Sequence, residues 1–158
     1  MKLAFFDMDG TIAAPRYLDN GKPVIGFDAQ GWINFCNETQ PDAYAICEVI
    51  QPVIDFAKQL KEKGYTLYIL TMSLSEAEEI SKRNFIRQMK LDTIFNDTLF
   101  TPDDDTKLIV MASCANKYHI PKEFCMLVED TYSTLLKAHE AGFQAVHISN
   151  ILTDTITC

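Results

Sequence analysis

The residues best suited to chemistry stand near the start of the chain, where Asp7, Asp9 and Thr11 follow the apolar residues 3–6. Side chains alternate across an extended strand, so carboxylates at positions i and i+2 point the same way. Their repulsion must be offset, and a hard divalent cation bound through oxygen does this readily. Taken alone, the pair would also suit a simple turn, since Gly10 lets the backbone bend sharply. The rest of the chain decides between a turn and an acidic metal site.

Polar groups also follow later apolar runs. They are Thr71, Met72 and Ser73 after residues 65–70, Lys107 beyond residues 98–100, and Glu129 with Asp130 after residues 124–128. In an open parallel sheet, sites form beyond the carboxyl ends of the strands. We therefore expect carboxylates, a hydroxyl and one lysine to gather at a single edge. The neighbouring acids 103–105 are better explained as the N-terminal cap of a helix, because acids favour the positive helix end.

The elements that must position these groups alternate along the chain. Near-continuous apolar runs, typical of buried parallel strands, occupy residues 3–6, 65–70, 98–100, 124–128 and 145–148. Helical spacing of apolar residues occupies 52–63, 75–89, 105–118 and 131–141. Alternating strands and helices require right-handed crossovers and a parallel sheet covered on both faces. The predicted fold is α/β, a Rossmann-like three-layer sandwich of about five strands in one domain spanning residues 1–158.

Residues 13–48 break this alternation and hold six of the twelve glycines and prolines. Residues 24–27 and 32–35 resemble a small β-hairpin, and residues 41–49 a helical turn leading to the next helix. We expect an insertion, or minimal cap, lying above the first strand. Cations are few in this stretch, so Arg16 is its best candidate for a substrate contact.

The composition excludes several function classes. The formal net charge of −8 argues against a nucleic-acid backbone or an anionic membrane as principal partner. No stretch approaches the ~20 apolar residues needed to span a bilayer, and the first residues do not resemble a signal peptide. The cysteines suit buried thiols in a reducing cytoplasm, because they are odd in number and lack a Cys-x-x-Cys pair. They are Cys36, Cys47, Cys114, Cys125 and Cys158.

Together the motifs resemble those of the haloacid dehalogenase-like superfamily of hydrolases, specifically its phosphatases. The four family motifs are matched by Asp7, Asp9 and Thr11 (Asp-x-Asp-x-Thr), then Thr71, then Lys107, and then Glu129 with Asp130. The resemblance covers nearly the whole chain except residues 13–48. An acid at position 9 favours a phosphatase or phosphotransferase, because relatives that cleave carbon–halogen bonds and the ion-pumping ATPases lack it.

The resemblance implies a role for each residue. Asp7 would be the nucleophile that becomes an aspartyl phosphate, and Asp9 would protonate the leaving alcohol and later activate water. Thr71 and Lys107 would bind the phosphoryl oxygens. The remaining substrate contacts would come from Thr11, Met72, Ser73 and Arg16. Mg²⁺ would be held by Asp7, the backbone carbonyl of Asp9 and Asp130, with Glu129 bound through water.

The substrate stays open between a small phosphorylated metabolite and a phosphoprotein, with a 5′-nucleotidase-like role as the alternative. A cap this small would suit a bulky substrate, or a homo-oligomer in which a neighbouring subunit completes the wall of the substrate site.

Two other classes of protein use similar residues. A receiver-type phospho-signalling domain is disfavoured by the order of the motifs, and a non-catalytic binding domain by the presence of every catalytic residue type. The prediction of an enzyme would be wrong if Lys107 or Asp130 lay more than about 10 Å from Asp7.

Overall fold

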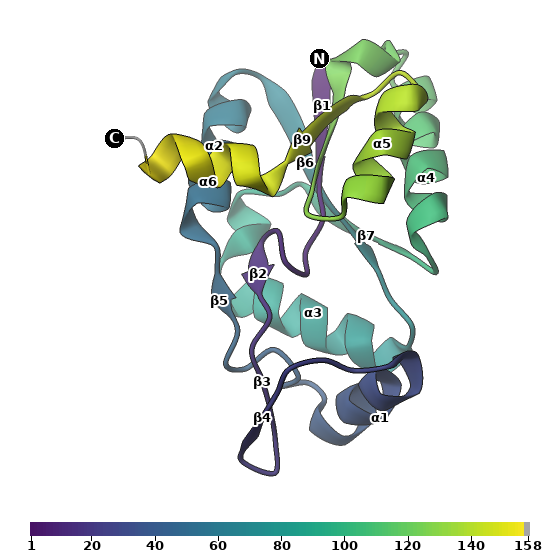
Figure 1. Cartoon of the computed structure of the whole chain (residues 1–158). Coiled ribbons are helices and arrows are strands. Elements are labelled where there is room, and N and C mark those ends of the chain that lie inside the picture. Colours follow the sequence, from purple (N-terminus) through teal and green to yellow (C-terminus); the bar gives the residue numbers. More distant parts are fainter. Residues whose placement is uncertain (157–158) are drawn as a thin grey trace.

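A five-stranded parallel sheet forms the centre of the computed structural model, which describes residues 1–156 (Figure 1). Its strand order is β7-β6-β1-β8-β9, and every neighbouring pair is parallel. The strands are β1 (Lys2–Phe6), β6 (Tyr65–Met72), β7 (Asp97–Thr101), β8 (Cys125–Glu129) and β9 (Gln144–His147). The five predicted strands and the α/β class are therefore confirmed.

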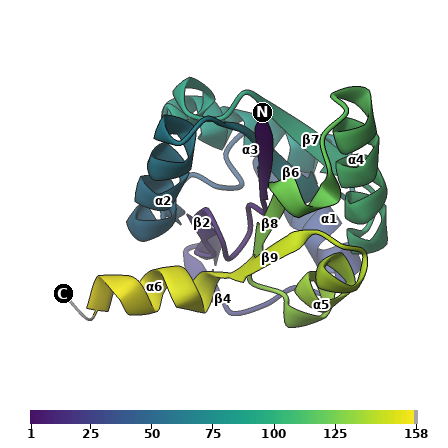
Figure 2. The same cartoon turned by 90° about the horizontal axis from the view of Figure 1, so that it is seen from above.

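Alternate residues of the central strand β1 face two separate cores. Ala4 and Phe6 belong to one core, and Leu3 and Phe5 belong to the other. This follows from the period-2 geometry of a strand buried on both faces. The first core is covered by α2 (Gln51–Glu62), α3 (Glu76–Gln88) and α6 (Ile148–Ile156), and the second by α4 (Asp104–Lys117) and α5 (Tyr132–Glu140) (Figure 2).

Two helices begin at N-cap residues that can be recognised in the sequence. Ser75 caps α3 by accepting a hydrogen bond from the backbone N–H of Glu78 at 3.2 Å. Asp103 caps α4 in the same way, accepting from the N–H of Thr106 at 2.7 Å. These helices begin within one residue of the positions predicted from the sequence. Two short 3₁₀ helices, η1 (Leu91–Thr93) and η2 (Lys122–Phe124), lie in the connections before β7 and β8.

The predicted hairpin of residues 24–27 and 32–35 is wrong. Residues 32–35 lie within α1 (Ala29–Thr39). Asp28 caps this helix, and its carboxylate accepts a hydrogen bond from the N–H of Gly31 at 2.6 Å. The hairpin lies earlier, between β3 (Tyr17–Asp19) and β4 (Lys22–Val24). Its Asn20-Gly21 turn has φ values of 50° and 76°, as a two-residue hairpin turn requires.

The expected helical turn at residues 41–49 is replaced by successive turns and a short strand. The N–H of Ala45 donates to the carbonyl of Asp42 at 3.0 Å, and residues 41–47 form turns rather than a helix. The chain then enters β5 (Glu48–Val49), which pairs antiparallel with β2 (Ala13–Ala14).

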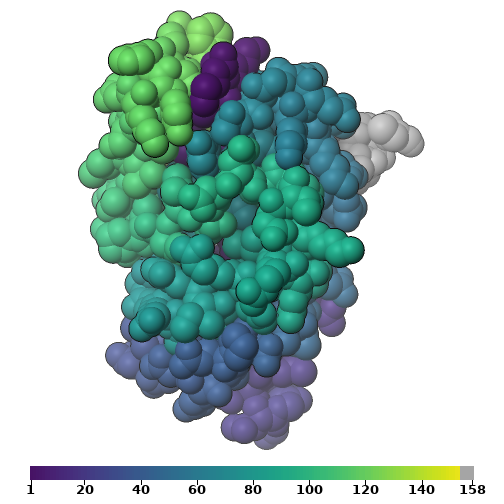
Figure 3. All heavy atoms as spheres, turned by 180° about the vertical axis from the view of Figure 1, so that it is seen from behind, coloured from purple at the N-terminus to yellow at the C-terminus, as the bar shows by residue number. Residues whose placement is uncertain are grey.

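The segment of residues 13–48 lies beyond the carboxyl ends of β1 and β6 (Figure 1). Helix α1 packs on α3, and seen from behind the two form a continuous surface (Figure 3). Aromatic rings fill the space inside the segment, with Tyr17 and Trp32 centroids 5.0 Å apart. These contacts attach the segment to the sheet domain on the side where the polar strand ends emerge.

Two expectations drawn from composition can be compared with the described residues. Within residues 1–156, no helix has the length and apolar character that crossing a membrane requires. Four cysteines are free thiols, of which Cys36, Cys47 and Cys125 are buried. Cys158 lies outside the described part of the chain.

Candidate active site

Residues from three separate strand ends meet at one point beyond the sheet. The Nζ atom of Lys107 lies 2.9 Å from Asp7 Oδ1 and 3.0 Å from Glu129 Oε2. Asp7 extends the line of β1, because its N–H donates to the carbonyl of Val128 at 3.0 Å. Lys107 reaches the same point from the first turn of α4, and all three side chains are buried. The expected convergence of Lys107 on Asp7 is thus present.

A group of three carboxylates surrounds this point and fits a divalent cation. Asp7, Glu129 and Asp130 each offer an oxygen, and these oxygens lie within 4.8 Å of one another. Asp130 is exposed, so the group opens to solvent on one side. Gly10 has φ +76° and lies so close that a side chain there would overlap the Asp130 carboxylate. Oxygen ligands of this kind, with one side open for water or phosphate, suit Mg²⁺.

Protonation equilibria at this point show that negative charge is in excess. Burial raises the pKa of Asp7, and this effect exceeds the lowering caused by Lys107. Burial, together with the charge of Asp7, raises the pKa of Glu129 to about 9. Burial would lower the pKa of Lys107, but the two carboxylates raise it above its usual range. One lysine does not balance the buried acids, and a bound cation would relieve the imbalance.

Glu129 also orders the loop that carries Asp130. Its Oε1 atom accepts hydrogen bonds from the N–H groups of Asp130 and Thr131, at 3.1 and 3.3 Å. Its Oε2 atom faces Lys107. Both oxygens are therefore engaged within the protein.

Three of the predicted substrate-binding residues make hydrogen bonds within the protein. Thr11 is buried, and its hydroxyl donates to Asp7 Oδ2 at 3.4 Å. The carbonyl of Met72 accepts a hydrogen bond from Lys82 at 2.6 Å. Ser73 ties β6 to β7, because its N–H donates to the carbonyl of Thr101 at 2.8 Å. Of these groups, the Thr11 hydroxyl alone contacts the carboxylate of Asp7.

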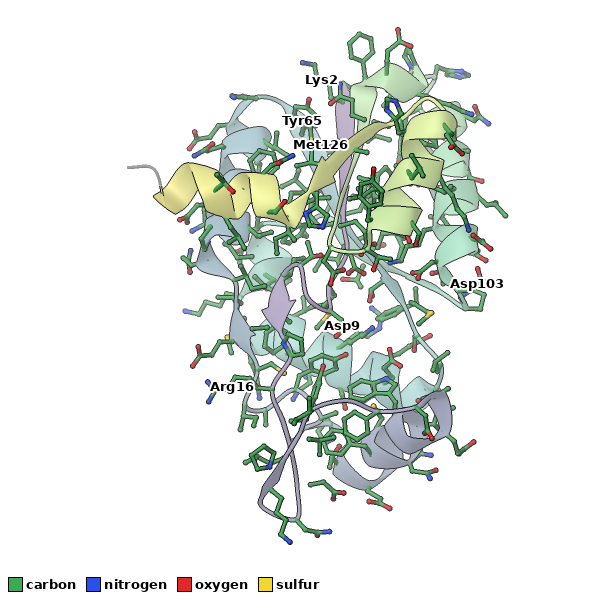
Figure 4. All side chains as sticks on the ribbon, in the orientation of Figure 1. Lys2, Asp9, Arg16, Tyr65, Asp103 and Met126 are labelled. Carbon is green, nitrogen blue, oxygen red and sulfur yellow. The ribbon has the colours of Figure 1, made fainter. Side chains whose placement is uncertain are left out.

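Arg16 is not brought to this cluster. Its guanidinium is exposed and pairs with the exposed carboxylate of Glu48 at 3.2 Å. In Figure 4 the Arg16 side chain points away from Asp9. The pairing has a simple cause: β2 and β5 run antiparallel, which places Arg16, just after β2, beside Glu48 at the start of β5.

Sequence reasoning missed a second buried group around Asp9. Lys82 Nζ lies 3.0 Å from Asp9 Oδ2, and the hydroxyl of Tyr44 donates to Asp9 Oδ1 at 2.7 Å. Lys82 also donates to the hydroxyl oxygen of Thr71 at 2.8 Å and pairs with Glu78 at 2.8 Å. A Glu–Lys pair at i,i+4 on a helix usually lies on the surface, so this one carried no functional signal.

The same group connects the edge of the sheet near Asp9 to residues 13–48. The indole N–H of Trp32 donates to Glu78 Oε1 at 2.5 Å, and Tyr44 contributes its contact with Asp9. Asp104 is another position outside the predicted set: its carboxylate lies 3.1 Å from Lys107 Nζ. Its neighbour Asp103 serves as the expected helix cap.

Comparison with known proteins gives information on the fold. No known family model matches the chain, and no curated protein matches its sequence. Solved structures with the same fold do exist. A haloacid dehalogenase (HAD)-superfamily hydrolase of subfamily IA, variant 1, from Geobacter sulfurreducens is 14% identical with a TM-score of 0.61, covering 93% of this chain and 89% of that chain.

Two further structures agree with this result. A predicted phosphoglycolate phosphatase from Haemophilus somnus is 17% identical with a TM-score of 0.60, covering 92% of this chain and 84% of its own. A haloacid dehalogenase-like family hydrolase from Streptococcus pneumoniae is 16% identical with a TM-score of 0.58, covering 97% and 90%. The chain therefore has the fold of the HAD-superfamily hydrolases, the superfamily that its sequence motifs resemble.

Proposed function

We propose that this protein is a Mg²⁺-dependent phosphatase that hydrolyses a phosphate monoester through an aspartyl-phosphate intermediate. The observation that carries the proposal is the meeting of Asp7, Lys107 and the Glu129–Asp130 pair beyond three different strands. A structural ion pair needs one lysine and one acid. Here Asp7 and Glu129 share one buried lysine, and their oxygens also lie within 4.8 Å of an oxygen of the exposed Asp130. This arrangement favours binding of a cation and an anionic substrate.

In the first step, a carboxylate oxygen of Asp7 attacks phosphorus, and the bond from phosphorus to the ester oxygen breaks. Asp9 transfers a proton to that departing oxygen, so the leaving group departs as a neutral alcohol. Lys107 fixes Asp7 in place and offsets charge on the phosphoryl oxygens. The hydroxyl oxygen of Thr71 accepts from Lys82, and the hydroxyl donates to the Met72 carbonyl at 3.4 Å. On substrate binding that hydrogen would turn to a phosphoryl oxygen.

In the second step, water attacks phosphorus of the acyl phosphate while Asp9 takes its proton. The bond from phosphorus to Asp7 breaks, which releases inorganic phosphate and restores the carboxylate. Mg²⁺ would be held by Asp7, Asp130 and the backbone carbonyl of Asp9, with Glu129 reached through water. When bound, the ion supplies positive charge that stabilises the phosphoryl oxygens during transfer.

The proposal is tested with a panel of phosphate esters in the presence of Mg²⁺. The panel holds a sugar phosphate, a nucleoside monophosphate, a phosphopeptide and 4-nitrophenyl phosphate, so that the alternative nucleotidase activity is also sampled. Asp7→Asn and Asp9→Asn are assayed beside the wild type. We expect phosphate release by the wild type on at least one ester and loss of release in both variants. A wild type that binds Mg²⁺ and hydrolyses none of the esters would instead indicate a binding domain.

A further inference from the structure

Lys82 is a buried lysine that joins two of the positions assigned to catalysis. Its Nζ atom lies 3.0 Å from Asp9 Oδ2 and donates to Thr71 Oγ1 at 2.8 Å. The side chain is 0% exposed, and burying an ammonium group is unfavourable unless its donors are satisfied. The Met72 carbonyl and Glu78 Oε2 are its remaining partners, at 2.6 and 2.8 Å. The position of the ammonium group is thus fixed from both β6 and α3.

Asp9 is held on its other oxygen as well. The hydroxyl of Tyr44, itself buried, donates to Asp9 Oδ1 at 2.7 Å. The Asp9 side chain nevertheless remains 41% exposed. Figure 4 places it at the junction between the edge of the sheet and residues 13–48. A carboxylate contacted on each oxygen, with one side open to solvent, is oriented toward that open side.

Lys82 has a second carboxylate partner besides Asp9, because Glu78 Oε2 lies 2.8 Å from its Nζ. Glu78 is also fixed in place, since its Oε1 atom accepts from the indole of Trp32 and from the N–H of Leu74 at 3.2 Å. A chain of polar contacts therefore connects α1 to Glu78, Glu78 to Lys82, and Lys82 to Asp9. Removing Asp9 would leave Lys82 satisfied, whereas removing Lys82 would leave Asp9 with the Tyr44 contact alone.

We propose that Lys82 is a positioning residue that orients the Asp9 carboxylate toward the leaving-group oxygen. This inference rests on the phosphatase function proposed above. A general acid must lie within hydrogen-bond reach of the atom that it protonates, so a small rotation of Asp9 would be enough to impair the step.

The test compares two esters that depend differently on a general acid. An alkyl phosphate has a strongly basic leaving group and needs protonation, whereas 4-nitrophenyl phosphate has a weakly basic one and needs it little. We expect Lys82→Met to lower kcat/KM for the alkyl ester at least ~10-fold more than for the aryl ester. Asp9→Asn should give the same pattern, and Asp7→Asn should abolish both reactions. The ratio isolates positioning, because general loss of folded enzyme lowers both values equally.

Controls separate the role of Lys82 from effects on folding. Glu78→Gln combined with Lys82→Met removes both buried charges, and this variant replaces the single one if circular dichroism shows that the single variant is unfolded. Lys61→Met removes an exposed lysine whose Nζ donates to the carbonyls of Thr93 and Ile94, at 3.0 and 3.3 Å. It should leave the ester ratio unchanged.

A double-variant cycle completes the test. If Lys82 acts through Asp9, adding Lys82→Met to Asp9→Asn should cause no further fall in kcat/KM for the alkyl ester. Equal losses on both esters in folded Lys82→Met, or a full additional loss in the Asp9→Asn background, would overturn the positioning role alone. A wild type inactive on both esters would overturn the phosphatase function and the positioning role together.

Discussion

Lys107 and Asp7 stand 100 positions apart in the chain and form a buried ion pair, with 2.9 Å between Nζ and Oδ1. Glu129 contacts the same ammonium group from the other side. The structure thus gives one lysine two buried carboxylate partners, and the stability of the metal-free protein depends on it.

Replacing Lys107 with methionine should destabilise the protein strongly. Asp7 and Glu129 would remain buried without a cation, and breaking a buried pair in this way typically costs about 3–5 kcal/mol. Urea unfolding of the metal-free variant measures the loss. Lys137→Met is the matched control, because its pair with Asp105 is exposed and should contribute little. Equal stability of both variants would contradict the buried arrangement.

Asp7→Asn should reduce phosphate release by at least about 10³-fold, because the amide cannot act as the nucleophile. The wild type, quenched in acid during turnover, should carry a phosphate on the peptide that contains Asp7. The variant should not. Mass spectrometry of the quenched protein checks both statements, and a phosphate mapped to another residue would displace Asp7 as the nucleophile.

The Glu129 contribution to metal-free stability should decline as pH rises. Burial, joined by the charge of Asp7, raises its pKa from 4.5 to about 9 in the folded protein. Between these values the folded protein keeps a proton that the unfolded chain has released, so rising pH favours unfolding. Thermal unfolding of the wild type and Glu129→Gln across this range isolates the effect.

Mg²⁺ should reverse that trend. A cation bound beside deprotonated carboxylates stabilises the folded state, and its affinity increases as protons leave. The rise in unfolding temperature on adding Mg²⁺ should therefore be larger near about pH 8.5 than near about pH 5.5. If Mg²⁺ does not change the unfolding temperature of the wild type at either pH, the proposed metal site is contradicted.

Gly10→Ala should weaken both folding and Mg²⁺ binding. Gly10 has φ +76°, and an added methyl group would overlap the Asp130 carboxylate. Gly21→Ala is an exact backbone match with the same φ, but nothing lies within 4 Å of its added methyl group. Both variants lose roughly 1 kcal/mol or more from the left-handed backbone. Isothermal titration should find the loss of Mg²⁺ affinity only in Gly10→Ala.

The sequence predicted the elements whose signals are local. Buried parallel strands appear as apolar runs, and Ser75 and Asp103 mark helix starts by capping chemistry. Convergence of the strand ends then follows from parallel topology alone, so Asp7 and Lys107 could be placed together before any coordinates.

Residues 13–48 were predicted poorly because aromatic residues suit both strands and helices. Trp32 and Phe35 resemble a strand, whereas their spacing with Cys36 is also that of a helix face. The local signal for the true hairpin is the Asn20-Gly21 pair, which suits a two-residue turn. Lys82 could not be found, since only tertiary packing turns a common surface pair into a buried one.

The central place of β1 has a consequence for biosynthesis. Its partners β6 and β8 are made later, so β1 gains one neighbour when β6 has left the ribosome and the other only after Glu129 has done so. Asp7 and Asp9 are therefore made long before the last residues of the proposed site. A nascent chain arrested just before Glu129 carries Asp7 and Lys107 but lacks the Glu129–Asp130 pair that would help to hold the cation.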